Sequence, residues 1–400
     1  MTGDLLMLTQ TGGAEEIKAA VQSGADVNAK DRSGTTALMF AAMFQSDPSV
    51  CEALLNAGAD IAAVQENGMT ALFFAAARCE NPEVISLLLD HGARVDARDK
   101  QGATPLIFAA MMNPRPEIAE VLMDAGADIG ETDRDGYTPL LWAAKKNPNP
   151  AVAAFLTDCG ADVRAREKRY GATALMLAAK DNPNDAMVNL LLTMGAKVNR
   201  AALNGYTALM LAAGKNRNPA VTEALLAAGA DPEMTNDNDY TALMFAAEDA
   251  SSARIVEALV RYGADVNRRS KKGATPLLMA ATKNPSAEVV EALLKAGADP
   301  TVRDMAIDES VAMWAAAKNP NPMVLDALLK AGADIRQKDR DGKTLLMAAA
   351  GSNESPAMVG YLLDNGCDPK DRDRMNATAA DYARRNTALF NTDVYWRLLA

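Results

Sequence analysis

The residue types that usually carry enzyme chemistry are scarce in this chain. Its 400 residues include one histidine, His91, and four cysteines that lie far apart without a Cys-x-x-Cys pair. Histidine-dependent catalysis and most zinc sites need more of these groups, and at closer spacing. The segment Gly342-Lys343-Thr344 matches the end of a phosphate-binding loop, but Gln337 stands where that motif requires glycine. We therefore expect no catalytic residue, no metal site and no cofactor.

Binding chemistry is better represented, because cations and aromatic residues recur at related positions. Lysines follow an Ala-Ala pair at Lys145, Lys146, Lys180, Lys215, Lys283 and Lys318. Tyrosines precede a recurrent threonine at Tyr137, Tyr206 and Tyr240, and earlier copies of the post-alanine segment carry Phe44, Met111 and Met112. Tyrosine is enriched where binding energy concentrates in protein interfaces, and lysine attracts acidic segments.

Composition limits the class of protein. Hydrophobic residues make up 49% of the chain and aromatic residues only 5%, so a packed aliphatic core is expected rather than disorder. The 41 basic and 52 acidic residues give a net charge of −11, which argues against nucleic acid or an anionic membrane as the partner. No apolar run reaches the ~18 residues of a membrane-spanning helix.

Location and assembly follow from weaker signals. The start of the chain lacks the basic segment and apolar run of a signal peptide, and the few cysteines fit a reducing compartment as small buried residues. We expect a cytoplasmic monomer. Whether a leader peptide was removed is left open.

The chain is internally repetitive, and the repeat must position these side chains. The triplet Gly-Ala-Asp, or a one-residue variant of it, recurs from Gly24 to Gly366 at spacings of 34 residues, and twice of 35. Before each next triplet comes the phrase Gly-x-Thr-(Ala/Pro)-Leu-x-x-Ala-Ala, as from Gly34 to Ala42. The glycine of this phrase is replaced by Asp239, Asp308 and Asn376. A fixed period of this length is the signature of a solenoid.

These phrases resemble the ankyrin repeat over nearly the whole chain, with about twelve units in a many-copy array of bacterial type. The resemblance implies an all-α fold with short β-hairpin or turn tips, a solenoid of stacked helix-turn-helix units. It also implies a protein that works by binding other proteins, through its hairpin tips and the concave surface of its inner helices. In the family a histidine usually follows Thr-Pro-Leu, whereas here Met39, Phe73 and their counterparts occupy that position, which we assign to the core.

The residues themselves indicate where the helices begin and end. Threonines such as Thr36 and Thr70 stand where an N-cap oxygen can accept from free helix amides, and proline often follows at the first helical position. The extra residue of the 34-residue unit falls between the helices. There we expect Asn147 to close the first helix in a left-handed conformation and Asn149 to cap the second.

We expect one solenoid over residues 1–400. Residues 1–30 are assigned to an N-terminal capping unit, 31–370 to the central repeats and 371–400 to a C-terminal capping unit. The repeat departs most from its pattern near residues 300–312, where we predict a weak joint.

The function expected from these features is a non-enzymatic scaffold that binds a partner protein through its concave inner-helix and hairpin-tip surface. The lysines and tyrosines are hypothesised to form a groove for an acidic segment of that partner. Inner-helix lysines also stabilise helix C-termini, and that structural role is the competing explanation for them. A regulatory or inhibitory subunit of an enzyme or toxin on another chain is the alternative function, and a mechanical spacer is a third.

Overall fold

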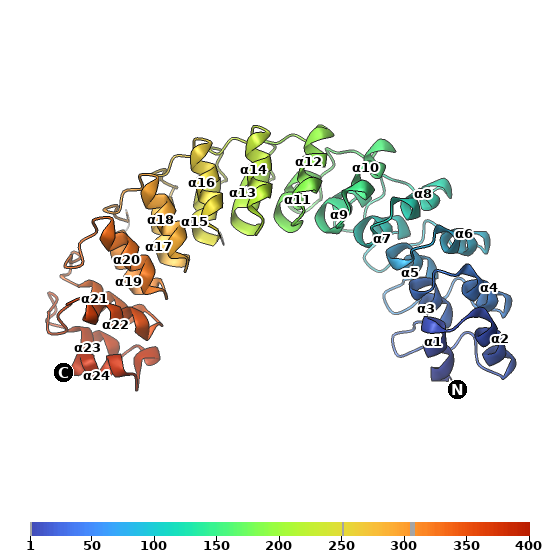
Figure 1. Ribbon diagram of the computed structural model, residues 1–400, viewed down its shortest axis with the longest axis horizontal. Coiled ribbons are helices and arrows are strands. Elements are labelled where there is room, and N and C mark those ends of the chain that lie inside the picture. Colours follow the sequence, from blue (N-terminus) through green and yellow to red (C-terminus); the bar gives the residue numbers. More distant parts are fainter. Residues whose placement is uncertain (1, 250–251, 305–308) are drawn as a thin grey trace. The chain divides into compact units, whose positions relative to one another are not determined.

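The computed structural model describes residues 2–249, 252–304 and 309–400, and in these it contains 24 α-helices and one 3-10 helix (Figure 1). The chain divides into two compact units, unit 1 (Met1–Lys197) and unit 2 (Val198–Ala400). The helices of unit 1 are α1 (Thr2–Thr11), α2 (Ala14–Gln22), α3 (Ala37–Phe44), α4 (Pro48–Asn56), α5 (Ala71–Arg78), α6 (Pro82–Asp90), α7 (Pro105–Met112), α8 (Pro116–Asp124), α9 (Pro139–Lys146), α10 (Pro150–Asp158), α11 (Ala174–Asp181) and α12 (Asp185–Thr193).

Unit 2 has the same alternation of helices. They are α13 (Ala208–Lys215), α14 (Pro219–Ala227), α15 (Ala242–Asp249), α16 (Ala253–Arg261), α17 (Pro276–Lys283), α18 (Ala287–Lys295), α19 (Val311–Lys318), α20 (Pro322–Lys330), α21 (Leu345–Ser352), α22 (Pro356–Asp364), α23 (Ala379–Ala383), η1 (Thr387–Leu389) and α24 (Asp393–Leu399). No helix among the described residues has the length and apolar character needed to cross a bilayer.

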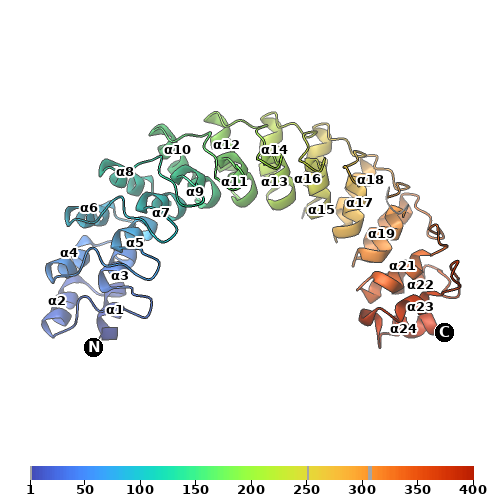
Figure 2. The same ribbon diagram turned by 180° about the vertical axis from the view of Figure 1, so that it is seen from behind.

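Each repeat contributes an antiparallel pair of helices, and the pairs stack in register. Within unit 1 the first helix of a pair packs against the first helices of its neighbours, as α5 does against α3 and α7, and the second helices do the same. Unit 2 repeats this pattern. We call the first helices inner and the second helices outer, because within each unit the two kinds form two separate rows (Figures 1 and 2). The fold is therefore the all-α solenoid that the sequence predicted.

Threonine caps start the inner helices. The side chain of Thr36 accepts a hydrogen bond from the amide of Met39, and Thr104 and Thr138 make the same bond in α7 and α9. Thr70 holds the N-cap position of α5 but makes no such bond, and its buried hydroxyl has no partner among the described residues. All four threonines thus occupy the predicted N-cap position, but the predicted hydrogen bond is wrong for Thr70.

Small and aliphatic side chains fill the core between the helix rows. The Leu and Ala-Ala positions of the repeat phrase are almost fully buried throughout both units. The position where the resemblance led us to look for histidine is buried as well, in Met39, Phe73, Ile107, Leu141, Met176, Met210, Met244, Leu278, Met313 and Met347. The assignment of these residues to the core is confirmed.

The hairpins between repeats are tight turns rather than strands. Four isolated antiparallel bridges occur among the described residues, as between Lys30 and Thr36. The glycine of the repeat phrase has a positive φ, which an L-residue adopts only at a cost in energy. Asp239 and Asn376 replace this glycine and keep the positive φ, at 58° and 62°, because Asp and Asn tolerate this region better than most residues.

A buried asparagine follows most inner helices and connects each repeat to the one before. Asn147 lies at 0% exposure, and its Nδ2 donates to the carbonyls of Ala110 and Asn113, both at 2.8 Å. Its Oδ1 accepts from the amide of Asn149 at 2.9 Å. The residues that we call the asparagine ladder are Asn113, Asn147 and Asn182 in unit 1, and Asn284, Asn319, Asn353 and Asn386 in unit 2.

The predicted backbone conformation of Asn147 is wrong. Its φ of −72° and ψ of 129° are extended rather than left-handed. An extended residue turns the chain out of the helix while its side chain points back under the preceding repeat, where two carbonyls would otherwise be buried without a donor. The prediction for Asn149 is correct, since its side chain accepts from Ala151 at the start of α10.

The weak joint predicted near residues 300–312 falls partly on residues 305–308, which lie outside the described residues. In the described part, Ser310 replaces the usual threonine and caps α19 by accepting from the amide of Met313 at 3.2 Å. The joint stays a prediction.

The four cysteines differ in burial more than the sequence suggested. Cys51 and Cys79 are buried, Cys367 is partly buried, and Cys159 is exposed at the C-terminal end of α10. Burial raises the pKa of the Cys51 thiol to about 12. The description as small buried residues therefore fits Cys51 and Cys79, and it is wrong for Cys159.

These differences predict the order of thiol reactivity at pH 8. Cys159 should react with an aromatic disulfide reagent first, whereas Cys51 and Cys79 should react only on unfolding, because a buried thiol neither ionises nor meets the reagent. Mass spectrometry of the labelled peptides would assign each thiol. Cys159→Ser should abolish the fast phase, and a fast phase that survives this substitution would contradict the assignment.

The asparagine ladder predicts a large effect for a small substitution. Asn147→Ala should destabilise unit 1 by about 2–4 kcal/mol, because it leaves two buried carbonyls without a donor. Urea denaturation followed by circular dichroism would measure the loss. Lys146→Ala, at the exposed neighbouring position, is the control and should cost less than about 0.5 kcal/mol. Equal effects of the two substitutions would count against the ladder.

Candidate functional site

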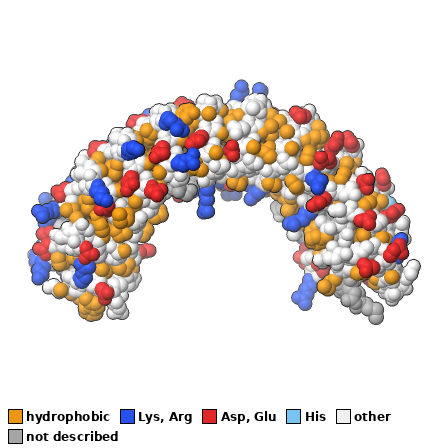
Figure 3. All heavy atoms as spheres, in the orientation of Figure 1, with side chains coloured by type: hydrophobic (Ala, Val, Ile, Leu, Met, Phe, Trp, Pro, Cys, Tyr) orange, Lys and Arg blue, Asp and Glu red, His pale blue; other side chains and the backbone are white. Residues whose placement is uncertain are grey.

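The predicted lysines lie in the last turns of the inner helices, in each unit by itself. In unit 1, Lys145 and Lys146 end α9 and Lys180 lies in the last turn of α11. In unit 2, Lys215, Lys283 and Lys318 are the last residues of α13, α17 and α19. Figure 3 shows Lys and Arg side chains projecting from the side of the molecule where the inner helices lie. The lysines occupy two adjacent helical positions rather than one common register.

Lys145 is held against two aromatic rings. Its Nζ lies 4.9 Å from the centroid of the Tyr137 ring and 5.0 Å from that of Trp142, and the two ring centroids are 4.8 Å apart. Ammonium groups are attracted to the faces of such rings, which also hold the flexible side chain in place. Sequence reasoning therefore paired Tyr137 with the lysines correctly at this position and missed Trp142.

Trp142 is itself fixed by the hairpin before it. Its Nε1 donates to Oδ2 of Asp133 at 2.8 Å, and Oδ1 of the same carboxylate accepts from the amide of Tyr137 at 2.9 Å. Tyr382 has the same position in a later repeat, where its hydroxyl donates to Asp373 at 2.6 Å and its ring lies under Lys343. The signal in the sequence is an aromatic residue nine positions after the hairpin aspartate, with a donor atom on its ring.

The surroundings of Tyr137 keep its phenol neutral. Burial is the main cause that raises the pKa of Tyr137 to about 12, and the negative charges of Glu167 and Asp181 add to it. Tyr137 therefore presents a hydroxyl group and an aromatic face at neutral pH, which suits contact with a partner rather than proton transfer.

Two lysines of unit 2 are neutralised by acidic residues on α15. Lys215 forms an ion pair with Asp249 at 2.7 Å, and Lys283 forms one with Glu248. The hydrogen bond that Lys283 donates to Glu248 is the main cause that raises the pKa of Lys283. Lys318 has no ion pair with a described residue. The positive charge expected along unit 2 is therefore largely compensated by the chain itself.

In unit 1 the lysines are less fully paired with acidic residues. Lys180 lies 3.8 Å from Asp181 of its own helix, while Lys145 has aromatic contacts and Lys146 has no ion pair with a described residue. The ends of α9 and α11 together carry three lysines and one aspartate. Lysines therefore outnumber acidic residues at the ends of these two helices, while the carboxylates of Glu167, Asp133 and Asp135 lie near Tyr137.

Comparison with protein-family models accounts for nearly all of the chain. The model described as ankyrin repeats (3 copies) matches residues 42–133, 76–167, 115–202, 140–234, 209–304 and 312–399, and the model described as ankyrin repeats (many copies) matches residues 12–55. The chain belongs to the ankyrin repeat family. A search of curated proteins finds no match to it. Ankyrin repeats generally mediate protein–protein interactions, and ankyrin repeat proteins are typically non-enzymatic binding scaffolds.

The tyrosines of unit 2 form part of a second aromatic cluster. The ring centroid of Phe245 on the ankyrin inner helix α15 lies 5.1 Å from that of Tyr206 and 5.7 Å from that of Tyr240. Phe245 has the same place in its repeat as Trp142 and was also missed. Its position in the repeat could have identified it, because the fourth residue of an inner helix is only partly buried.

The apolar residues predicted in the early ankyrin repeats lie on the same kind of surface. Phe44 is 50% exposed and stacks on Phe40, with ring centroids 6.4 Å apart, and Met112 is 40% exposed while Met111 is partly buried. The sequence did not single out Phe40, Phe74 and Phe108, which are partly exposed at the fourth position of α3, α5 and α7. Unit 1 therefore carries an apolar row followed by the lysines of α9 and α11.

The residues that the sequence offered for enzyme chemistry have structural roles. His91 is the exposed C-cap of α6, and its Nδ1 lies 2.9 Å from the carbonyl oxygen of Leu87. Thr344 caps α21, and Lys343 lies over the Tyr382 ring. The described residues contain no group of three or more His, Cys, Asp or Glu side chains placed to hold a metal ion.

The bond between Trp142 and Asp133 predicts a selective effect on stability. Trp142→Phe should destabilise unit 1 by about 1–3 kcal/mol, because it leaves a buried carboxylate oxygen without its donor. Trp396→Phe is the matched control, since Trp396 is 60% exposed. Urea denaturation curves of both variants would check this. A change at Trp142 no larger than that at Trp396 would contradict it.

Proposed function

We propose that this ankyrin repeat protein is a non-catalytic scaffold that binds a partner protein through its inner helices and hairpin ends. The observation that carries the proposal is the inner-helix surface of unit 1, where partly exposed aromatic rings lead to three lysines that share a single aspartate on their two helices. Such a surface offers both apolar area and long-range attraction to a partner.

An acidic segment is the partner chemistry that we propose for Lys145, Lys146 and Lys180. These three lysines face only one aspartate on their own two helices. Lys215 and Lys283 contribute less to this proposal than the sequence led us to expect, since an acidic segment would compete there with Asp249 and Glu248. The proposed contact surface therefore includes the predicted residues of unit 1 first, among them Tyr137, Phe44, Met111 and Met112.

Other parts of the proposal rest on the sequence alone. We propose a cytoplasmic location because the few cysteines fit a reducing compartment. We also propose that the protein acts as a monomer, with capping units at residues 1–30 and 371–400.

Charge reversal on unit 1 tests the proposal. The full chain and its Lys145→Glu, Lys146→Glu, Lys180→Glu variant would be used to capture partners from an extract, and binding of each identified partner would be measured at two salt concentrations. We expect the variant to bind at least tenfold more weakly at low salt, with a smaller salt dependence, because three attractive charges become repulsive.

The matched control carries the same change in net charge on outer helices. It is the Arg261→Glu, Lys295→Glu, Lys330→Glu variant of α16, α18 and α20. It should bind like the wild type. Equal weakening in both variants would refute the proposed site, and a failure of folded wild-type protein to bind any protein would refute the scaffold itself.

A further inference from the structure

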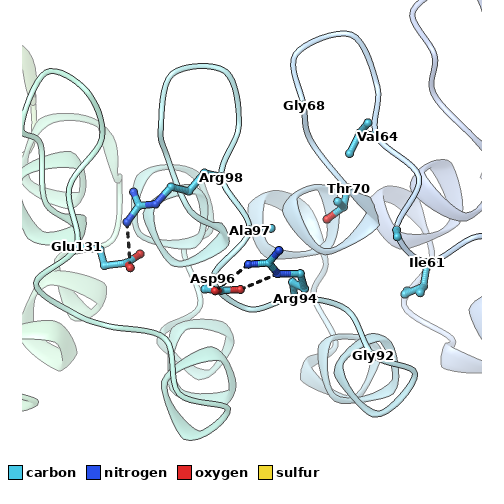
Figure 4. A pocket seen from close by; sticks show the side chains of 11 residues that line it. Ile61, Val64, Gly68, Thr70, Gly92, Arg94, Asp96, Ala97, Arg98 and Glu131 are labelled. Atoms are coloured by element: carbon cyan, nitrogen blue, oxygen red, sulfur yellow. Dashed lines mark hydrogen bonds and ion pairs between the residues drawn. The ribbon is translucent and has the colours of Figure 1, made fainter.

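A hollow of about 580 Å³ opens between two successive hairpins of unit 1 (Figure 4). One wall comes from the hairpin that carries Val64, Gly68 and Thr70, and the other from the segment with Asp96 and Ala97. It lies on the hairpin side of the repeats and contains none of the residues assigned above to the inner-helix surface.

The hollow lies where Val64 stands at a position that holds an arginine in several other repeats. In the following repeat Arg98 occupies the position of Val64, and its Nη1 donates to the carbonyls of Gly102 at 2.8 Å and Thr132 at 3.1 Å. Arg269 and Arg372 have the same position in unit 2 and likewise donate to the carbonyl four residues further on. A guanidinium at this position thus satisfies a hairpin carbonyl within its own repeat.

Val64 has no donor group and cannot make this hydrogen bond. The carbonyl that corresponds to Gly102 O is Gly68 O, and no described residue donates a hydrogen bond to it. The carbonyl that corresponds to Thr132 O is Arg98 O, and it too receives no hydrogen bond from a described residue. Since carbonyl oxygens accept hydrogen bonds, the hollow offers two acceptors that the chain itself does not use.

The donors in the walls are already engaged. Arg98 is paired with Glu131 at 2.9 Å, in addition to its two carbonyls. Arg94 binds Asp96 through two parallel hydrogen bonds, at 3.0 and 3.1 Å. Figure 4 shows Arg98, itself part of the lining, joined to Glu131. The charges of the walls cancel, so a ligand is selected by the free acceptors.

The rest of the lining is apolar and suits the stem of a long side chain. Val64 is 49% exposed, and Ile61, Ala62 and Ala97 complete this part of the surface. Lysine and arginine bury their methylene groups on such surfaces while the charged end makes hydrogen bonds. Arginine fits the acceptors better, because its planar group presents several N–H donors at once.

We propose that this hollow binds a basic side chain, an arginine above all, supplied by a partner protein. The guanidinium takes the place that Arg98 fills in the next repeat, donating to Gly68 O and to Arg98 O, the counterparts of Gly102 O and Thr132 O. The site goes beyond the inner-helix surface proposed above and does not depend on it.

The test uses Nα-acetyl-arginine amide as the probe and the full chain labelled with ¹⁵N. Titration should produce saturable NMR shifts at the amides of Gly68, Thr70 and Ala97. The citrulline analogue has nearly the same shape without the charge, and it should bind about tenfold more weakly, since charge-assisted hydrogen bonds are lost.

Two variants test the site, one by filling the hollow and the other by creating a second one. Val64→Arg should fill the hollow from within and abolish the shifts, and Arg98→Val should open an equivalent hollow and create new shifts near Gly102 and Thr132. The Lys145→Glu, Lys146→Glu, Lys180→Glu variant should leave the titration unchanged, which separates this site from the inner-helix surface. Absence of shifts in the wild type, equal binding of citrulline, or unchanged binding in Val64→Arg would each overturn the proposal.

Discussion

The rest of the structure depends on the side-chain amide of the asparagine ladder. An inner helix ends in carbonyl groups that have no donor within the helix, and here they are buried under the next repeat. Asn147 donates to two such carbonyls of the preceding repeat and accepts from the amide of Asn149, where the outer helix begins. One buried side chain therefore joins two repeats and fixes where the outer helix starts. It also places the residues just before it, Lys145 and Lys146, at the surface.

The hairpin carboxylates link the fold to the candidate site in a similar way. Asp133 holds its turn with one oxygen and Trp142 with the other, so the position of the ring depends on the hairpin. Lys145 in turn lies against that ring and against Tyr137. The ammonium group of Lys145 is thus positioned by a chain of contacts from backbone to carboxylate to ring. Where a repeat lacks one member of such a set, as at Val64, an unoccupied acceptor results.

Similar sequence positions have acquired different electrostatic characters in the two units. Lysines end inner helices in both, but in unit 2 the neighbouring helix α15 supplies Glu248 and Asp249, which pair with Lys283 and Lys215. In unit 1 the lysines of α9 meet aromatic rings instead. Exposed ion pairs contribute little to stability, so the main effect of these pairs is to neutralise positive charge at the ends of α13 and α17.

The sequence by itself determined the repeat, the helices, the capping positions and the buried methionine row, because these follow from local periodicity and from residues that act within one repeat. Contacts between repeats were not accessible in this way. The sequence placed Asn147 in a left-handed turn, whereas its side chain reaches carbonyls in the repeat before and its backbone is extended. Likewise only the tertiary structure decided that Lys215 is paired and that Val64 leaves a hollow, since both depend on atoms about 34 residues away along the chain.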